Sequence, residues 1–236
     1  VQSTTLFCGD SQVMADLFDL KREGFFYSRL ANPTVDALEK KVAALEGGVC
    51  GIGCASGMSA VLLTAMTLCE AGDNIVTASE IYGGTFNLFS TTLPKFGIEA
   101  RFFDADAPAE EIEALIDEKT KFVFAETIAN PAVIVLDFDK IAAVCKRHGV
   151  LFIVDNTRAT PALCRPFEWG ANIVIHSTSK YMDGHAAALG GMIVDGGNFT
   201  YKNNVRYPAF NTPDESYHGL VYADLPVAFG TKCRAQ

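Results

Sequence analysis

The chain has 236 residues, of which 49% are hydrophobic, and its formal net charge at pH 7 is −9. This length and composition predict a globular domain with a substantial core, and the acidic balance argues against nucleic-acid binding, which needs a basic patch. We find no run of eighteen or more apolar residues and no signal-peptide pattern, so we expect no membrane helix and a cytoplasmic protein. The seven cysteines lack zinc-like spacing and are expected to be buried free thiols, with no metal site.

Residues 1–33 show little hydrophobic periodicity and are predicted to form an extended arm outside the sheet. Tyr27 and Arg29 lie two residues apart, so in an extended chain their side chains point the same way. Such a pair can hold a phosphate, because a guanidinium group matches phosphate geometry. The alternative is a packed tyrosine beside a solvated arginine.

Residues 34–48 have the pattern of a helix capped by Thr34 and ended by Gly47-Gly48. Its apolar residues recur at intervals of three and four and form one helical face: Val35, Leu38, Val42 and Leu45.

A glycine-rich turn from Gly51 to Met58 follows and leads into a strongly apolar helix, Ser59 to Cys69. Free backbone N–H groups and the helix dipole at such a turn favour a phosphate. The glycine spacing matches neither a Walker A motif nor the dinucleotide-binding fingerprint. A purely structural turn is the alternative.

Short apolar segments alternate with helices along the rest of the chain. The predicted strands are residues 74–78, 98–103, 122–125, 150–154 and 171–175. Helices are expected after Pro108 and from Asp139 to His148. This alternation predicts an α/β fold with a mainly parallel sheet covered on both faces.

Candidate functional residues follow these strands, at the sheet edge where open parallel sheets bind ligands. They are Tyr82, Asn130, Asp155, Ser177, Ser179 and Lys180. Tyr82 can lie flat against a ring or be a packed aromatic. Asp155 follows a buried strand and needs a partner, either a helix N-terminus or a bound cation such as a protonated ring nitrogen. A partly desolvated Lys180 can attack a carbonyl to form a Schiff base, whereas the alternative is a solvated loop lysine.

One cofactor uses all of these parts. A phosphate needs a helix N-terminus with hydroxyl groups or an arginine, and a pyridine ring needs an aromatic partner and a carboxylate near its nitrogen. An aldehyde needs a lysine. Together these features indicate pyridoxal phosphate, whose chemistry depends on a lysine and on a charged group at the ring nitrogen.

At the level of motifs, the chain resembles the Cys/Met-metabolism family of pyridoxal-phosphate enzymes. The matching segments are Tyr27-Ser-Arg29 with Asn32-Pro33-Thr34, Ala55-Ser-Gly-Met58, Tyr82-Gly-Gly84, Glu126 with Asn130-Pro131, Asp155-Asn-Thr157, and His176-Ser-Thr-Ser-Lys180 with Gly184-His185. The resemblance implies the large domain of fold type I, with a mainly parallel seven-stranded sheet over residues 34–236 and an insertion near 198–222. It also implies that the family's small C-terminal domain is absent from this chain.

The resemblance assigns roles to individual residues. Lys180 is expected to form the Schiff base and to move protons, with Tyr82 stacking on the ring as a second catalytic group. Asp155 is expected to pair with the ring nitrogen. The other implied cofactor-binding residues are Ser56, Gly57, Met58, Ser177 and Ser179 at the phosphate, Asn130 and Thr157 at the ring edge, and Tyr27 and Arg29, which would reach the phosphate of a neighbouring subunit. Shared sites imply a homodimer, or the homotetramer usual in the family.

Within the family, the chain looks most like the O-acetylhomoserine sulfhydrylases, on segments such as Cys164-Arg-Pro-Phe167 and Pro213-Asp-Glu-Ser-Tyr-His-Gly219. The implied reaction is γ-replacement on O-acetylhomoserine by sulfide or methanethiol, which yields homocysteine or methionine. One alternative is γ-elimination, although the γ-lyases for methionine carry a cysteine where Gly84 stands. Another is an inactive cofactor-binding fragment or assembly module. Arg158 and Ala186-Ala-Ala188 depart from the family pattern.

Overall fold

In a computed structural model of the chain, which describes residues 1–19 and 21–236, seven strands form one sheet in the order β1-β7-β6-β5-β4-β2-β3. The strands are β1 (Cys50–Cys54), β2 (Asn74–Ala78), β3 (Glu99–Phe103), β4 (Thr120–Glu126), β5 (Leu151–Asp155), β6 (Ile173–His176) and β7 (Gly191–Asp195). Strands β2 to β6 pair in parallel, whereas β7 runs antiparallel to both β6 and β1. The predicted mainly parallel, seven-stranded sheet is confirmed.

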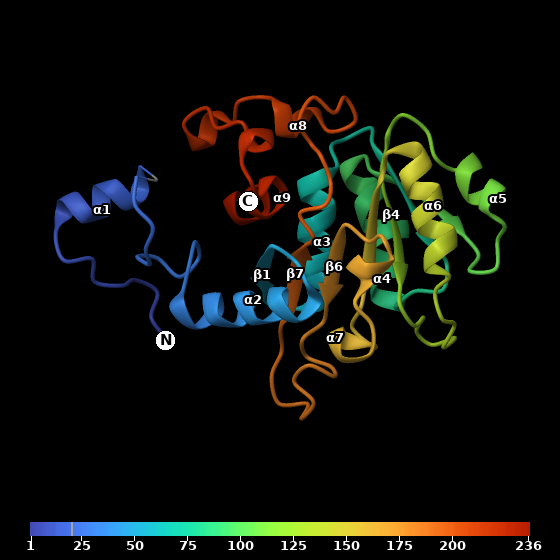
Figure 1. The fold of residues 1–236 in the computed structure, drawn as a ribbon, viewed down its shortest axis with the longest axis horizontal. Helices are drawn as coiled ribbons and strands as arrows, with labels where there is room; N and C mark the ends of the chain where they lie inside the picture. The colour runs from blue at the N-terminus through green and yellow to red at the C-terminus, as the bar shows by residue number, and fades with distance from the viewer. Residues whose placement is uncertain (20) are drawn as a thin grey trace.

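Helices separate the successive strands along the chain, except that a segment of turns, residues 177–190, joins β6 to β7 (Figure 1). They are α1 (Ser11–Phe18), α2 (Pro33–Glu46), α3 (Gly57–Leu68), α4 (Gly83–Asn87), α5 (Ala109–Ala114), α6 (Phe138–His148), α7 (Thr160–Leu163), α8 (Pro208–Asn211) and α9 (Ala228–Ala235). The central strand β5 is buried on both faces from Leu151 to Val154, as expected of a parallel strand between helical layers. Throughout residues 1–19 and 21–236, every helix falls short of the length and apolar character that a membrane crossing requires.

The arm differs from the predicted extended segment, because it contains helix α1. Asp10 caps this helix by accepting a hydrogen bond from the Val13 N–H at 2.9 Å. The arm then returns through an isolated bridge between Thr5 and Tyr27. It extends away from the sheet at the N-terminal side of α2 (Figure 1). Helix α1 has only eight residues, which are too few turns for a helical period to be recognised in the sequence.

The cap of helix α2 lies two residues earlier than predicted, and the helix buries a different face. Its cap is Asn32 rather than Thr34, with Pro33 as the first helical residue, while Gly47 ends it in the left-handed conformation as expected. Three of its four stripe residues are exposed: Val35 at 41%, Leu38 at 47% and Leu45 at 51%. The buried side instead holds two glutamates, Glu39 and Glu46, beside Val42 and Ala43.

The predicted glycine-rich turn is largely strand β1. Gly51 and Gly53 belong to that strand and pair with Val194 and Met192 of β7. A Cβ atom on Gly51 would lie 2.5 Å from the Glu39 carbonyl oxygen, so glycine is needed there for the close approach of α2. Only Ala55 and Ser56 separate the strand from α3, which begins at Gly57 rather than at Ser59.

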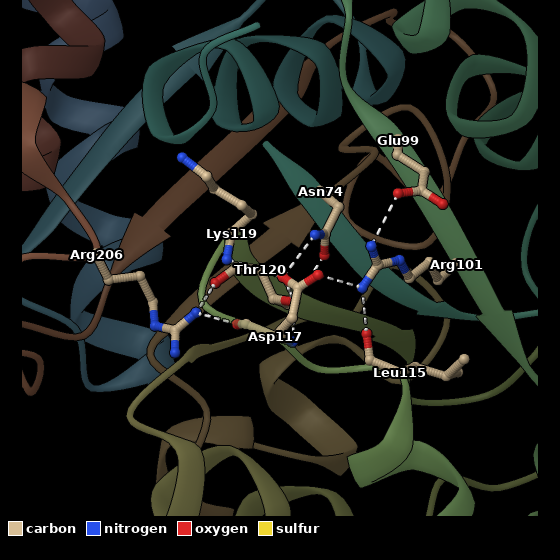
Figure 2. Close-up of polar contacts among 8 residues, drawn as sticks. All are labelled: Asn74, Glu99, Arg101, Leu115, Asp117, Lys119, Thr120 and Arg206. Atoms are coloured by element: carbon tan, nitrogen blue, oxygen red, sulfur yellow. Dashed lines mark hydrogen bonds and ion pairs between the residues drawn. The ribbon is translucent and has the colours of Figure 1, made fainter. Parts of the chain in front are cut away.

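The segment predicted as an insertion, residues 198–222, packs at the amino ends of the central strands. Arg206 donates hydrogen bonds to the carbonyl oxygens of Asp117 and Thr120, both at 2.6 Å, next to a cluster in which Asn74 and Arg101 bind Asp117 (Figure 2). The Tyr207 hydroxyl donates to the Lys121 carbonyl oxygen. Helix α8 of this segment and helix α7 lie at opposite ends of the sheet (Figure 1). This segment therefore does not cover the carboxyl ends of the central strands, where the candidate site lies.

Candidate functional site

The carboxyl ends of β4, β5 and β6 lie level with one another. Glu126 of β4 is the register partner of Asp155 of β5, which in turn is the partner of Ile175 of β6. Register partners in a sheet place their side chains on the same face. Two carboxyl groups therefore project side by side from this edge, and the segment 177–180 begins one residue beyond β6.

The two carboxyl groups have different surroundings. Burial raises the pKa of Asp155, although hydrogen bonds from Thr157, including its N–H to Oδ1 at 2.9 Å, act in the opposite direction. Burial, together with the neighbouring charge of Asp155, raises the pKa of Glu126 to about 8. The Tyr82 N–H donates to Glu126 Oε1 at 2.7 Å. A cation bound here would reduce the cost of ionising Asp155.

The N-terminus of α3 lies against the segment that carries Lys180. Ser56 caps the helix in a reciprocal arrangement with Ser59, so its hydroxyl already accepts the Ser59 N–H at 3.1 Å. A Cβ atom on Gly57 would lie 2.6 Å from Ser177 Cβ and 2.9 Å from Ser177 Cα. Only glycine permits this approach. The free N–H groups at the helix start therefore lie beside Ser177, an arrangement suited to an anion.

Tyr82 and Met58 both lie against Gly84 of α4. A Cβ atom on Gly84 would be 2.5 Å from Cε1 of the Tyr82 ring and 3.2 Å from Met58 Sδ. The ring is exposed, and its position is held by the backbone bond to Glu126. The Tyr82 backbone is thus tied to the edge that carries the two carboxyl groups.

The segment 177–180 is fixed by its backbone and by its hydroxyl groups. The Ser177 N–H donates to Thr157 Oγ1 at 2.7 Å, which joins the ends of β5 and β6. Ser179 Oγ donates to the Gly190 carbonyl oxygen at 3.1 Å and accepts the Gly190 N–H at 2.9 Å. Lys180 is exposed, so the expected partial desolvation of this lysine is not met in this structure.

The remaining predicted residues lie at different distances from this edge. Asn130 is half-buried in the loop after β4, and its N–H contributes to the hydrogen bonding of Glu126. Tyr27 and Arg29 lie together on the arm, with the guanidinium carbon 5.8 Å from the ring centroid. They form a turn rather than an extended pair, because the N–H groups of Leu30 and Ala31 bind the Tyr27 carbonyl oxygen. The arm leads away from the sheet (Figure 1).

Known proteins share both the sequence and this architecture. The sequence pattern of the Cys/Met metabolism PLP-dependent enzymes matches residues 1–217. The chain belongs to this family. It is 46% identical over 231 residues to a homocysteine/cysteine synthase of Kluyveromyces lactis, covering 96% of this chain and 52% of that protein. It is 48% identical over 217 residues to O-acetyl-L-homoserine sulfhydrylase 1 of Thermus thermophilus, covering 92% and 51%.

The family's solved structures agree with the fold. A Campylobacter jejuni protein assigned as an O-acetylhomoserine (thiol)-lyase superimposes with a TM-score of 0.92 at 44% identity, over 97% of this chain and 57% of that one. That structure contains N'-pyridoxyl-lysine-5'-monophosphate. Cystathionine gamma-lyase from Lactobacillus plantarum gives 0.76 at 31% identity, over 99% and 52%. The chain spans about half the length of the curated relatives it matches.

This member of the family also has a buried polar row that the sequence analysis did not single out. It consists of Thr127, Asn156 and His176, which lie behind the edge and meet Glu46 of α2. Each belongs to or adjoins an apolar strand segment. The sequence offered one signal for this row, because Asn156 is a polar residue next to the predicted site residue Asp155. Its partner Glu46, however, lies on a helix more than 100 residues away in sequence.

Proposed function

We propose that the chain is the cofactor-binding portion of a pyridoxal-phosphate-dependent transferase that acts on O-acetyl-L-homoserine. The observation that carries the proposal is the approach of the α3 N-terminus, at Gly57, to Ser177, three residues before Lys180. This brings an anion site and a lysine to the edge that also holds Asp155. Phosphate, aldehyde and ring nitrogen each have a matching group within one short stretch of surface.

The residues present fit pyridoxal phosphate. The close cradle between Gly57 and Ser177 suits the phosphate, and the buried Asp155 suits a protonated ring nitrogen, which would favour its ionised form. Met58 and Ser56 adjoin the phosphate position, while Ser179 and Thr157 hold the surrounding backbone in place. Asn130 would adjoin the ring edge through the loop that bonds Glu126.

Bound pyridoxal phosphate would supply an electron sink for negative charge that develops beside the substrate amino group. The chain's own residues perform the remaining tasks. Lys180 Nζ would hold the aldehyde carbon and then carry protons between the substrate's α-carbon and neighbouring positions. Tyr82 would cover the ring from the solvent side. Acetate would leave the γ-carbon, and sulfide or methanethiol would bond to that carbon in its place. The product would be homocysteine from sulfide or methionine from methanethiol.

A neighbouring subunit would complete the site. Tyr27 and Arg29 are exposed on an arm that leads away from their own sheet, so they can reach the phosphate of a second copy. The exposed stripe of α2, residues Val35, Leu38 and Leu45, offers apolar surface for such a contact. We therefore propose a homodimer or homotetramer. A cytoplasmic location accords with seven cysteines that form no disulfide in the described residues.

The test is to add pyridoxal phosphate to the purified protein and to record its visible absorbance. Wild type should become yellow, Lys180→Ala should stay colourless, and Lys202→Ala should behave as wild type, because Lys202 pairs with Asp224 on the surface. O-acetylhomoserine with sulfide should then give homocysteine. Thiol-independent release of 2-oxobutanoate would favour the elimination reaction instead, and a colourless wild type would overturn the proposal.

A further inference from the structure

A second row of polar side chains lies directly behind the candidate site. Asn156 follows Asp155 in sequence, and His176 precedes Ser177. Side chains alternate between the two faces of a strand, so these two residues point away from the face that carries Asp155. The register pairs Asp155 with Ile175, which places Asn156 and His176 level with each other on the opposite face.

One carboxylate oxygen of α2 joins this row. Glu46 Oε1 accepts a hydrogen bond from Asn156 Nδ2 at 2.9 Å and contacts His176 Nε2 at 2.6 Å. An ionised carboxylate only accepts, so Nε2 is then the protonated ring nitrogen. The row continues to β4, because Asn156 Oδ1 accepts the Thr127 hydroxyl at 2.7 Å. The ends of three neighbouring strands are therefore linked through residues adjacent to the site.

Burying this carboxylate is costly. The side chains of Glu46 and His176 are both 0% exposed, and a buried charge is tolerated only when it is paired and hydrogen-bonded. Among the described residues, Glu46 Oε2 and His176 Nδ1 have no hydrogen-bond partner. A well-packed apolar cluster would avoid both penalties. An incompletely satisfied buried network at this place points to a role in geometry rather than in stability.

We propose that Glu46 is a positioning residue that sets the spacing between Asp155 and the segment 177–180, and thereby the fit of the bound cofactor. The proposal rests on the proposed function. Glu46 touches neither the cofactor position nor the reacting atoms, and acts through Asn156 and His176. Without its shared oxygen, the two strand ends lose the only described side-chain link between Asn156 and His176. The ring nitrogen partner and the phosphate partner would then shift relative to each other.

The experiment measures the dissociation constant of pyridoxal phosphate for cofactor-free protein, by visible absorbance, together with the visible circular dichroism of the bound ring. Glu46→Leu should weaken binding roughly 10- to 100-fold, the range seen when outer partners of a ligand site are removed, and should change the dichroism. Glu46→Gln keeps an oxygen that can accept both hydrogen bonds and should restore affinity to within about threefold of wild type. Thr127→Val, a milder change at the end of the row, should weaken binding several-fold.

The matched control is Glu39→Leu. Glu39 is also buried on α2, seven residues earlier, but it binds the Gly53 N–H and Arg234 and has no link to the row. The Glu39→Leu substitution should lower the free energy of unfolding while leaving the affinity for the cofactor unchanged. Equal loss of affinity in Glu39→Leu and Glu46→Leu, or wild-type affinity in both Glu46→Leu and Thr127→Val, would overturn this proposal alone. A wild type that binds no cofactor would overturn the proposed function as well.

Discussion

Glu126 and Asp155 stand side by side as register partners at the ends of β4 and β5, and the charge of Asp155 makes it harder for Glu126 to ionise. Burial raises the pKa of both groups, and for Glu126 the neighbouring Asp155 adds to the effect. Glu126 accepts the Tyr82 N–H, so the pair also determines where Tyr82 lies. Because the pKa of Glu126 is raised, the free energy of unfolding should depend on pH.

Glu126 should make the cofactor-free protein less stable as the pH rises. Its pKa is about 8 in the folded state, against 4.5 as the ordinary value. Below pH 4.5 both states are protonated, so no penalty exists. Between about 4.5 and 8 only the unfolded state ionises, so the free energy of unfolding falls, and above 8 the loss is complete.

Glu126→Gln should remove this dependence and raise the free energy of unfolding above pH 8 by about 4–5 kcal/mol, since the pKa rises from 4.5 to about 8 and one pKa unit corresponds to about 1.4 kcal/mol. The Gln side chain can still accept the Tyr82 N–H. Urea unfolding of both proteins at pH 5 and pH 9 measures the effect. Parallel pH profiles for the two proteins would contradict the account of Glu126.

Gly57→Ala should weaken cofactor binding at least about tenfold, because the new methyl group would lie 2.6 Å from Ser177 Cβ and force the helix start away from it. The strain should also cost about 1–3 kcal/mol of stability. Gly83→Ala is the stability control, because a Cβ there meets nothing within 4 Å. Unchanged binding in Gly57→Ala would show that the phosphate lies elsewhere.

Arg206→Ala should lower the free energy of unfolding by about 1–3 kcal/mol, because it leaves the carbonyl oxygens of Asp117 and Thr120 without their charged donor (Figure 2). Cofactor affinity should not change, since this cluster is at the amino ends of the strands. Arg165→Ala, which removes an exposed pair with Glu168, should cost less than about 0.5 kcal/mol. A loss of affinity that exceeds the loss of stability in Arg206→Ala would contradict this separation.

Leu38→Glu should convert the oligomer to monomers by placing a charge in the exposed stripe of α2. Val205→Glu is the control, because Val205 is an even more exposed apolar residue and lies in the segment 198–222, away from α2. Sedimentation velocity distinguishes the states. Wild type that sediments as a monomer would rule out a shared site between subunits.

The parallel strands β2 to β6 were predictable because buried parallel strands are continuous apolar runs, whereas β1 was interpreted as a glycine-rich turn and β7 was not predicted. Residues 74–78 match β2 residue for residue, and Asp155 and Lys180 were selected as candidates because polar groups follow such runs abruptly. The buried face of α2 was not predictable in the same way. Its inner side carries Glu39 and Glu46, whose partners come from distant strands and from α9, while Val35, Leu38 and Leu45 are exposed. A helical pattern predicts the buried face from the polarity of the residues alone. In α2 the two glutamates are buried because they have hydrogen-bond partners elsewhere in the fold.

The site was predictable as a set of residue types but not as a set of contacts. Ser179 was expected to offer its hydroxyl group to a phosphate, yet it binds Gly190, and the hydroxyl of Ser56, another implied cofactor-binding residue, caps α3. Glu126 attracted attention only as part of a motif, because its raised pKa depends on burial and on the register with Asp155. Register between strands is a property of the folded sheet and is not written in any local segment.

The central claim is that Lys180 is the amine that holds pyridoxal phosphate. Treating the cofactor-loaded protein with borohydride and mapping its peptides by mass spectrometry tests this directly, because reduction fixes the group to the nitrogen that carried it. We predict one pyridoxyl group, on the peptide that contains Lys180. A group attached to a different lysine, or an unmodified Lys180 peptide from fully loaded protein, would contradict the account.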